Sequence, residues 1–116
     1  RHIHGQTSLR IDAPDQLPTL PAAVEVAAYR IMQEAMTNVL KHAHARHCVV
    51  SLAVVRMEGR RALAIEVRDD GIGLPQERSA GVGLAAIHER ATEVGGTCHV
   101  AAITDGGTRV CACLPI

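Results

Sequence analysis

Hydrophobic and polar positions change their spacing several times along the chain, and each change predicts a new element. Residues 7–12 (TSLRID) alternate polar and apolar side chains, which predicts a strand. Prolines at 14, 18 and 21 then indicate an extended connector. No glycine or proline follows until Gly59, so residues 21–43 are predicted to form one long helix. Its apolar stripe consists of Val24, Ala28, Ile31, Ala35 and Val39, with Ala27, Met32 and Met36 alongside.

The second half of the chain reads as two hairpins with a helix between them. Residues 47–57 and 62–69 are rich in β-branched side chains and are joined through Glu58-Gly59-Arg60. A glycine-rich segment over 69–83 leads into a predicted helix over 84–94, closed by Gly95-Gly96. Residues 97–104 and 108–116 form the last hairpin, around a turn at 105–107. This order predicts an α/β (α+β) fold: a two-layer sandwich whose mixed, mostly antiparallel sheet carries its helices on one face.

Composition narrows the classes of function. The chain has 116 residues, enough for one domain with its own core. Twelve basic residues balance 12 acidic ones, so no overall field attracts nucleic acid or an anionic membrane, and we expect neither as a direct partner. Tyr29 is the only aromatic residue, so the core must be aliphatic and stacking platforms for single-stranded nucleic acid are missing. The four cysteines fit no disulfide or metal framework and are expected to be reduced, small apolar residues.

A first polar cluster lies near the end of the long predicted helix. Glu34, Asn38 and Lys41 are spaced i, i+4, i+7, which stacks them on one helical face. An asparagine oxygen is a hard neutral ligand for Mg²⁺, a glutamate can hold a metal-bound or attacking water, and a lysine can contact a phosphate. The alternative is a solvated face with ordinary pairing, either of Glu34 with Lys41 or of Glu34 with Arg30.

A second cluster, Asp69-Asp70-Gly71-Ile72-Gly73, comes directly after a predicted strand. Glycines there permit positive φ angles and a close approach of a ligand to the backbone. A carboxylate at the end of a strand can accept a hydrogen bond from a purine amino group at the bottom of a pocket. The alternative is an ordinary Asp-Gly turn.

A third cluster, Gly81-Val82-Gly83-Leu84, opens the second predicted helix, where free backbone N–H groups bind anions. Gly81, Gly83 and Ala86 also match the spacing of the dinucleotide fingerprint, and Asp105 follows at a suitable distance. That fingerprint requires a strand directly before its first glycine, whereas residues 76–80 form a polar loop. An anion site on the helix is therefore favoured over a dinucleotide fold.

In this order the three clusters resemble the motifs of the GHKL ATPase superfamily. QEAMTNVLKHA resembles the N box, RDDGIGLP the G1 box and GVGLAAIHERA the G2 box, and GGTRVCACLP resembles the last hairpin. The resemblance runs from about Leu20 to Ile116. Within the superfamily, YRIMQEAMTNVLKHA and IHERATEVGG are similar to sensor histidine kinases that pair with response regulators of the nitrate-regulator type. Residues 1–116 then correspond to the ATP-binding catalytic domain, without the dimerisation (phosphoacceptor) and sensor domains.

The resemblance also implies a role for each site residue. Asn38 matches the Mg²⁺-binding asparagine and Glu34 the acidic residue one turn earlier. In hydrolysing relatives that glutamate activates water, whereas in the kinases it organises metal and phosphate, and both roles remain open here. Asp69 matches the aspartate that recognises the adenine amino group. The other implied nucleotide contacts are Lys41 and His42 on the phosphate side, Gly71 and Gly73 at the purine floor, Gly81, Gly83 and Leu84 at the lid, and Thr108 at the adenine end.

The implied function is phosphoryl transfer in two-component signalling. Such a domain binds ATP with Mg²⁺ and donates the γ-phosphate to a histidine on the dimerisation domain of a homodimeric parent, from which a response regulator is phosphorylated. The resemblance implies a cytoplasmic domain, whether or not the parent is anchored in a membrane. The isolated fragment is expected to bind ATP without autophosphorylation. The alternatives are a stand-alone serine kinase of the anti-sigma-factor type and a non-enzymatic module that has lost nucleotide binding.

Overall fold

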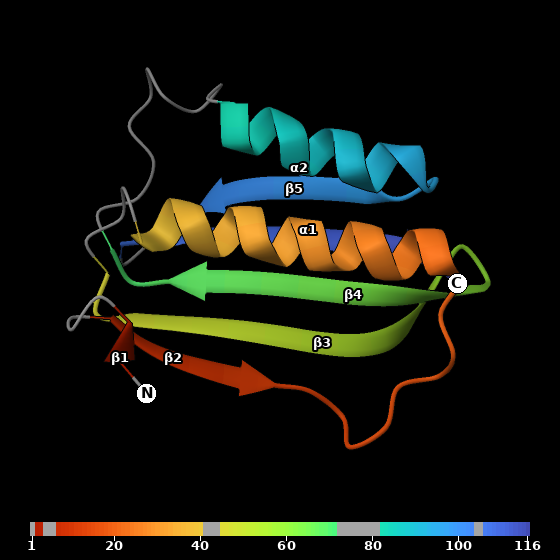
Figure 1. The fold of residues 1–116 in the computed structure, drawn as a ribbon, viewed down its shortest axis with the longest axis horizontal. Coiled ribbons are helices and arrows are strands. Elements are labelled where there is room, and N and C mark those ends of the chain that lie inside the picture. The colour runs from red at the N-terminus through yellow and green to blue at the C-terminus, as the bar shows by residue number, and fades with distance from the viewer. Residues whose placement is uncertain (1, 4–6, 41–44, 72–81, 104–105) are drawn as a thin grey trace.

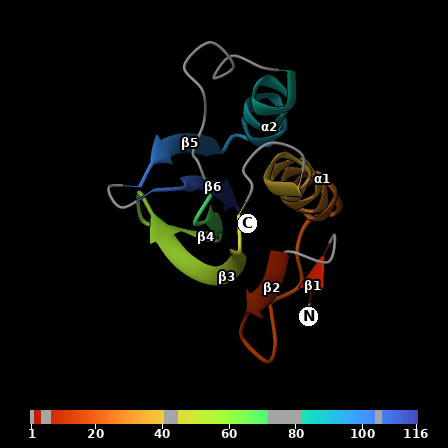
Figure 2. The ribbon, with the colours of Figure 1, turned by 90° about the vertical axis from the view of Figure 1, so that its left-hand side faces the viewer.

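The fold is a two-layer α/β sandwich with both helices on one face of the sheet (Figures 1 and 2). The computed structural model describes residues 2–3, 7–40, 45–71, 82–103 and 106–116. The predicted fold class is confirmed. The strands are β1 (His2–Ile3), β2 (Thr7–Asp12), β3 (His47–Met57), β4 (Arg60–Asp69), β5 (Thr97–Ala102) and β6 (Thr108–Pro115), and the helices are α1 (Ala22–Asn38) and α2 (Val82–Glu93).

The sheet has the strand order β1-β2-β3-β4-β6-β5. Only β2 and β3 pair in parallel, and the other neighbours are antiparallel. The β3–β4 hairpin closes through Glu58 and Gly59, whose φ angles of 52° and 79° are both positive, as a tight hairpin turn with native strand twist requires. Its register places Cys48 opposite Asp69. The end of β4 and the start of β3 therefore lie side by side at one end of the sheet.

Helix α1 buries the stripe that its sequence predicts. Val24, Ala28, Ile31 and Ala35 are all buried against the sheet. The regular α-helix ends at Asn38, earlier than the predicted end at residue 43. Residues 39 and 40 continue in a wider turn of the π type, and residues 41–44 lie outside the described part of the chain. The difference arises because the absence of glycine and proline predicts continued helix and carries no signal for a widened turn.

Helix α2 begins at Val82, two residues before the predicted start, and ends as its glycines predict. Gly95 has a φ of 77°, the left-handed conformation that ends many helices. The N–H of Gly96 donates to the carbonyl of Ala91 at 2.8 Å, and the N–H of Gly95 donates to that of Thr92 at 2.9 Å. This pair of bonds is the Schellman motif, and it turns the chain directly into β5.

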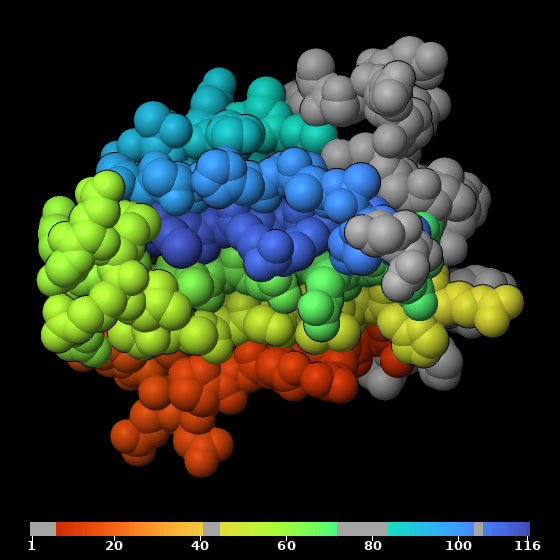
Figure 3. Space-filling model, turned by 180° about the vertical axis from the view of Figure 1, so that it is seen from behind, coloured from red at the N-terminus to blue at the C-terminus, as the bar shows by residue number. Residues whose placement is uncertain are grey.

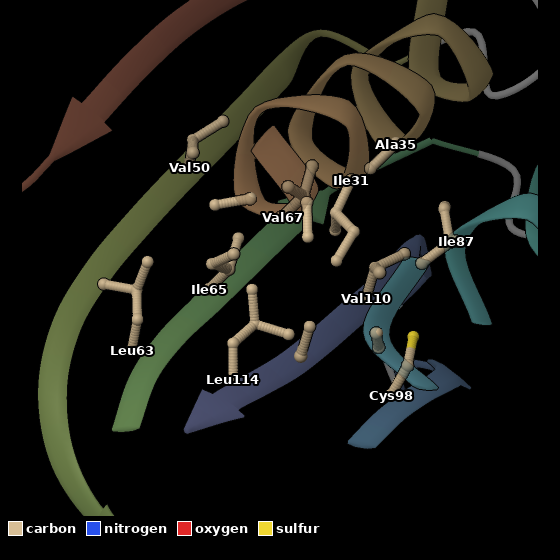
Figure 4. Packing of buried hydrophobic residues seen from close by; sticks show 14 of the residues in the cluster. Ile31, Ala35, Val50, Leu63, Ile65, Val67, Ile87, Cys98, Val110 and Leu114 are labelled. Carbon is tan, nitrogen blue, oxygen red and sulfur yellow. The ribbon is translucent and has the colours of Figure 1, made fainter. Parts of the chain in front are cut away.

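The core between helices and sheet is built from aliphatic side chains (Figure 4). Ile31 from α1 and Ile87 from α2 are fully buried, together with Leu63 and Ile65 from β4 and Leu114 from β6. Tyr29 lies outside this core, with 63% of its surface exposed. The opposite face of the sheet carries no helix in the described part of the chain (Figure 3). No described helix has the length and apolar character needed to span a bilayer.

Shortening one core side chain tests this packing. Ile31 has 0% exposure, so Ile31→Val leaves a methyl-sized void and is expected to lower the free energy of unfolding by about 0.5–1.5 kcal/mol. The matched control is Ile11→Val on β2, where the side chain is 62% exposed and the expected change is within about 0.5 kcal/mol. Urea denaturation followed by far-UV circular dichroism measures both. Equal effects in the two variants would contradict the assignment of Ile31 to the core.

Candidate functional site

The described site residues from all three clusters gather at one end of the molecule. Strand β4 runs towards this end and finishes at Asp69, α1 finishes there at Asn38, and α2 and β6 begin there (Figure 1). The gathering follows from the topology, because β4 and α1 run towards the same end while α2 and β6 leave it. Residues far apart in sequence are therefore brought to the same end of the fold.

Asp69 is a buried carboxylate with a fixed direction. Its side chain belongs to the buried face of β4 and the residue is 7% exposed. Its Oδ1 accepts a hydrogen bond from the N–H of Gly71 at 2.8 Å, and the backbone of Thr108 supplies another. Burial raises the pKa of Asp69 and the neighbouring Asp70 raises it further, while the bonds from Gly71 and Thr108 lower it, with a net rise. The predicted position of Asp69 at the strand end is confirmed, and its lone pairs are only partly used.

A close backbone approach holds Thr108 beside Asp69. Gly107, the residue before Thr108, has a φ of 102° and is buried. A Cβ built on Gly107 would overlap the carbonyl oxygen of Asp69 and come within 3.0 Å of the Cα of Asp70. Only glycine therefore allows the β5–β6 turn to touch the end of β4. Sequence reasoning placed a turn at residues 105–107 but missed this contact, for which the paired glycines 106 and 107 are the signal.

Asp70 has a structural role that the sequence did not reveal. Its Oδ1 accepts hydrogen bonds from the N–H groups of Arg46 and His47, both at 2.9 Å, and its Oδ2 lies 2.7 Å from Nδ1 of His47. The slight desolvation of Asp70 raises its pKa, but the bonds from the His47 backbone, the His47 ring and the Arg46 backbone outweigh it and leave the pKa lowered. The two adjacent aspartates therefore have opposite environments. Asp69 is buried with a raised pKa, and Asp70 is exposed with a lowered one.

The two described polar residues of the α1 cluster are half-buried. Glu34 and Asn38 lie one turn apart, at the edge of the buried stripe rather than in open solvent. The alternative pairing of Arg30 with Glu34 does not form. Within the described ranges, no group of three or more histidine, cysteine, aspartate or glutamate side chains could hold a metal ion. A lone amide oxygen nonetheless suits Mg²⁺, which usually takes most of its ligands from phosphates and water.

The remaining predicted site residues divide into described and undescribed ones. Gly83 lies in the first turn of α2, and the next residue, Leu84, is buried. Gly71 is half-buried, with its N–H committed to Asp69. Lys41, His42, Gly73 and Gly81 lie outside the described residues. The anion site at the start of α2 and the phosphate contact of Lys41 therefore stay predictions.

Among the hollows that described residues line, two differ in position and size. One of about 270 Å³ opens at the strand ends and is lined by His47, Val49, Arg68, Asp69, Asp70, Ile103 and Gly106. The other, of about 400 Å³, lies between the start of α1 and the end of α2 and is lined by Ala22, Ala23, Val26, Ala27, Arg30, Arg90, Glu93 and Val94. The second hollow is larger but contains none of the predicted site residues. Chemistry rather than volume therefore identifies the strand-end region as the candidate site.

The family match and the similar proteins agree with one another. Residues 23–116 match the family described as histidine kinase-, DNA gyrase B-, and HSP90-like ATPase. The chain is 36% identical over 110 residues to the nitrate/nitrite sensor protein NarQ of Escherichia coli, covering 93% of this chain but only 19% of that protein.

Many solved structures share the fold. The histidine kinase domain of a blue-light activated histidine kinase from Erythrobacter litoralis superposes with a TM-score of 0.74 at 24% identity, over 97% of this chain and 52% of that one. The ATP binding domain of PrrB from Mycobacterium tuberculosis superposes with a TM-score of 0.62 at 25% identity, over 92% of this chain and 79% of that one.

Proposed function

Because the chain belongs to the histidine kinase-, DNA gyrase B- and HSP90-like ATPase family, we propose that it binds ATP with Mg²⁺ and donates the γ-phosphate to a histidine on a separate dimerisation domain. The observation that carries this proposal is the Asp69 carboxylate. It is buried at a strand end and oriented by Gly71 and Thr108, and its burial raises the pKa of Asp69. Perturbed, buried carboxylates of this kind are concentrated at functional sites.

Recognition of adenine follows from the capacity of that carboxylate. An ionised carboxylate has about four lone-pair sites, of which the backbone groups of Gly71 and Thr108 occupy two. The remaining sites accept a hydrogen bond from the adenine amino group. A purine with a carbonyl oxygen in place of that amino group would leave the buried charge unpaired, so the site selects ATP over inosine and guanosine triphosphates.

The phosphates are assigned to the helical side of the site. Asn38 binds the Mg²⁺ that accompanies ATP, with Glu34 beside it as an organiser of metal and phosphate, and the start of α2 with Gly83 faces the anionic end. Mg²⁺ neutralises the charge that develops on the transferring phosphoryl group. The protein contributes positioning and electrostatic stabilisation, which supply most of the rate in phosphoryl transfer. Adenine recognition on β4 and phosphate positioning on α1 thus belong to different elements at the same end of the fold.

The phosphoryl acceptor and later partners are proposed from the kind of relative the chain matches. The chain covers 19% of the length of NarQ. We place the acceptor histidine in another part of the parent protein. We assign that histidine to a dimerisation domain of a homodimeric cytoplasmic kinase region that passes the phosphoryl group to a response regulator. Because the relative NarQ is a sensor protein, a histidine kinase function is favoured over a serine kinase of the anti-sigma-factor type.

Calorimetric titration of ATP into the chain, with and without Mg²⁺, tests the proposal. The wild type is expected to bind with a dissociation constant between about 1 μM and 1 mM. Asn38→Ala should abolish the gain in affinity that Mg²⁺ brings, because the amide ligand of the metal is gone. Gln33→Ala removes an exposed amide that lies five residues earlier on α1 and should leave that gain intact. A folded wild type that binds no ATP, or an Asn38→Ala variant with the full Mg²⁺ effect, would contradict the proposal.

A further inference from the structure

The second aspartate of the strand end, Asp70, joins the end of β4 to the start of β3. Its carboxylate accepts from the backbone N–H groups of Arg46 and His47 at 2.9 Å and lies 2.7 Å from the His47 ring nitrogen. Its own N–H donates to the carbonyl of His47 at 3.3 Å. These contacts come directly after the last β3–β4 ladder pair at this end, Cys48 with Asp69. Asp70 therefore fastens the strand ends where the regular ladder stops.

The partner segment of Asp70 is itself held in place on its other side. The hydroxyl of Thr7 on β2, a buried side chain, donates to the carbonyl of Ala45 at 2.9 Å. The N–H of Ser8 donates to the carbonyl of Arg46 at 2.8 Å. Residues 45–47 thus lie between β2 on one side and Asp70 on the other. The start of β3 is therefore a fixed support against which Asp70 can hold the end of β4.

The position of Asp70 determines the position of Asp69 and of its hydrogen bonds. Asp70 is the only residue between Asp69 and Gly71, whose N–H donates to the Asp69 carboxylate at 2.8 Å. Rotation of the Asp70 backbone would move the Gly71 N–H away from that carboxylate. The Cα of Asp70 also lies against Gly107, so a shift there would disturb the approach that brings Thr108 to Asp69. Displacements of this size, about 1 Å, are enough to impair recognition at a pre-organised site.

We propose that Asp70 is a positioning residue for nucleotide recognition: by bonding to Arg46 and His47 it holds the Asp69 carboxylate in the geometry that distinguishes adenine from other purines. The inference rests on the proposed role of Asp69. Successive residues of an extended chain face opposite ways, and the carboxylate of Asp70 is occupied by the start of β3. Asp70 therefore acts through Asp69 rather than by contact with the ligand.

The experiment measures affinities for ATP and for inosine triphosphate, which lacks the amino group, by calorimetry in the 116-residue chain. Asp70→Ala is expected to weaken ATP binding about tenfold, which corresponds to about 1.4 kcal/mol, and to leave inosine triphosphate binding unchanged. His47→Ala removes only the ring contact and should weaken ATP binding about twofold. The control Asp12→Ala removes an exposed carboxylate paired with Arg10 on β2 and should change neither affinity.

Circular dichroism at the titration temperature identifies the variants that are folded. If Asp70→Ala is not folded, Asp70→Asn replaces it as the test variant. This amide keeps an acceptor oxygen for the backbone N–H groups, so it should fold and show a partial loss of the preference for ATP. A preference for ATP equal to that of the wild type in a folded Asp70 variant would overturn the inference while leaving ATP binding by the wild type intact. Failure of the wild type itself to bind ATP would overturn the proposed function and this inference together.

Discussion

Replacing Asp69 with asparagine is expected to weaken ATP binding by about 10- to 100-fold while the domain stays folded. Hydrogen bonds to a charged group contribute about 1.5–3 kcal/mol, and the neutral amide loses that charge where the adenine amino group binds. The amide still offers an oxygen to the N–H groups of Gly71 and Thr108, so the local backbone keeps its bonds. Calorimetric titration measures the affinity. Wild-type affinity in Asp69→Asn would mean that another group recognises the base.

The same substitution is expected to preserve or raise stability at neutral pH. The pKa of Asp69 is raised in the folded protein, first by burial. A carboxyl group of this kind contributes stability that is fully present below its unfolded pKa, about 3.9, and is lost as pH rises through the folded pKa. At neutral pH the buried charge therefore destabilises the fold, and Asp69→Asn removes it. Denaturation curves should show the variant gaining on the wild type as pH rises from about 3 to 7. A fall in its relative stability over that range would contradict this linkage.

Gly107→Ala is expected to lower the free energy of unfolding by about 3 kcal/mol or more and to abolish measurable ATP binding with it. The added methyl group would overlap the carbonyl oxygen of Asp69, and the φ of 102° is a strained conformation for alanine. The β5–β6 turn would have to withdraw from β4, which takes Thr108 away from the Asp69 carboxylate. Chemical denaturation and calorimetric titration measure the two effects.

Gly106→Ala is the matched control for that substitution. Gly106 has nearly the same φ, 108°, but its added methyl group would meet only the carbonyl oxygen of Gly71, at an ordinary 3.6 Å. The expected cost is the conformational strain alone, about 1–2 kcal/mol. If the two alanine variants lose the same stability, the close approach of Gly107 to Asp69 is not what makes glycine necessary.

Much of the fold could be predicted because its elements have clear periods and clear ends. The alternation in residues 7–12 and the run in 47–57 gave the bounds of β2 and β3 as the structure has them. Strand β1 was missed because two residues have no period to detect. Helix α1 follows its predicted course to Asn38, after which residues 39 and 40 widen into a π-type turn that no sequence pattern signals; the predicted end at residue 43 lies outside the described residues.

The location of a candidate site residue was predictable where it follows from the residue's own position in the chain. Asp69 was identified because it ends a strand and precedes glycines, and Asn38 because of its spacing from Glu34. Asp70 and Gly107 were missed because their roles depend on contacts across the fold: Asp70 bonds to Arg46, 24 residues away, and Gly107 packs on Asp69. No local pattern reports such contacts. The contributions of Lys41, His42, Gly73 and Gly81 stay predictions.

The position of Tyr29 determines how this protein can be observed. Tyr29 is the only aromatic side chain in the sequence, and it lies exposed on α1 rather than in the core. Ultraviolet emission from the protein therefore comes from one solvent-facing phenol, whose surroundings change little on unfolding. Loss of native packing will therefore change intrinsic fluorescence and near-ultraviolet circular dichroism very little. This weak protein emission is also an advantage, because the fluorescence of an adenine nucleotide analogue can be followed against almost no protein background.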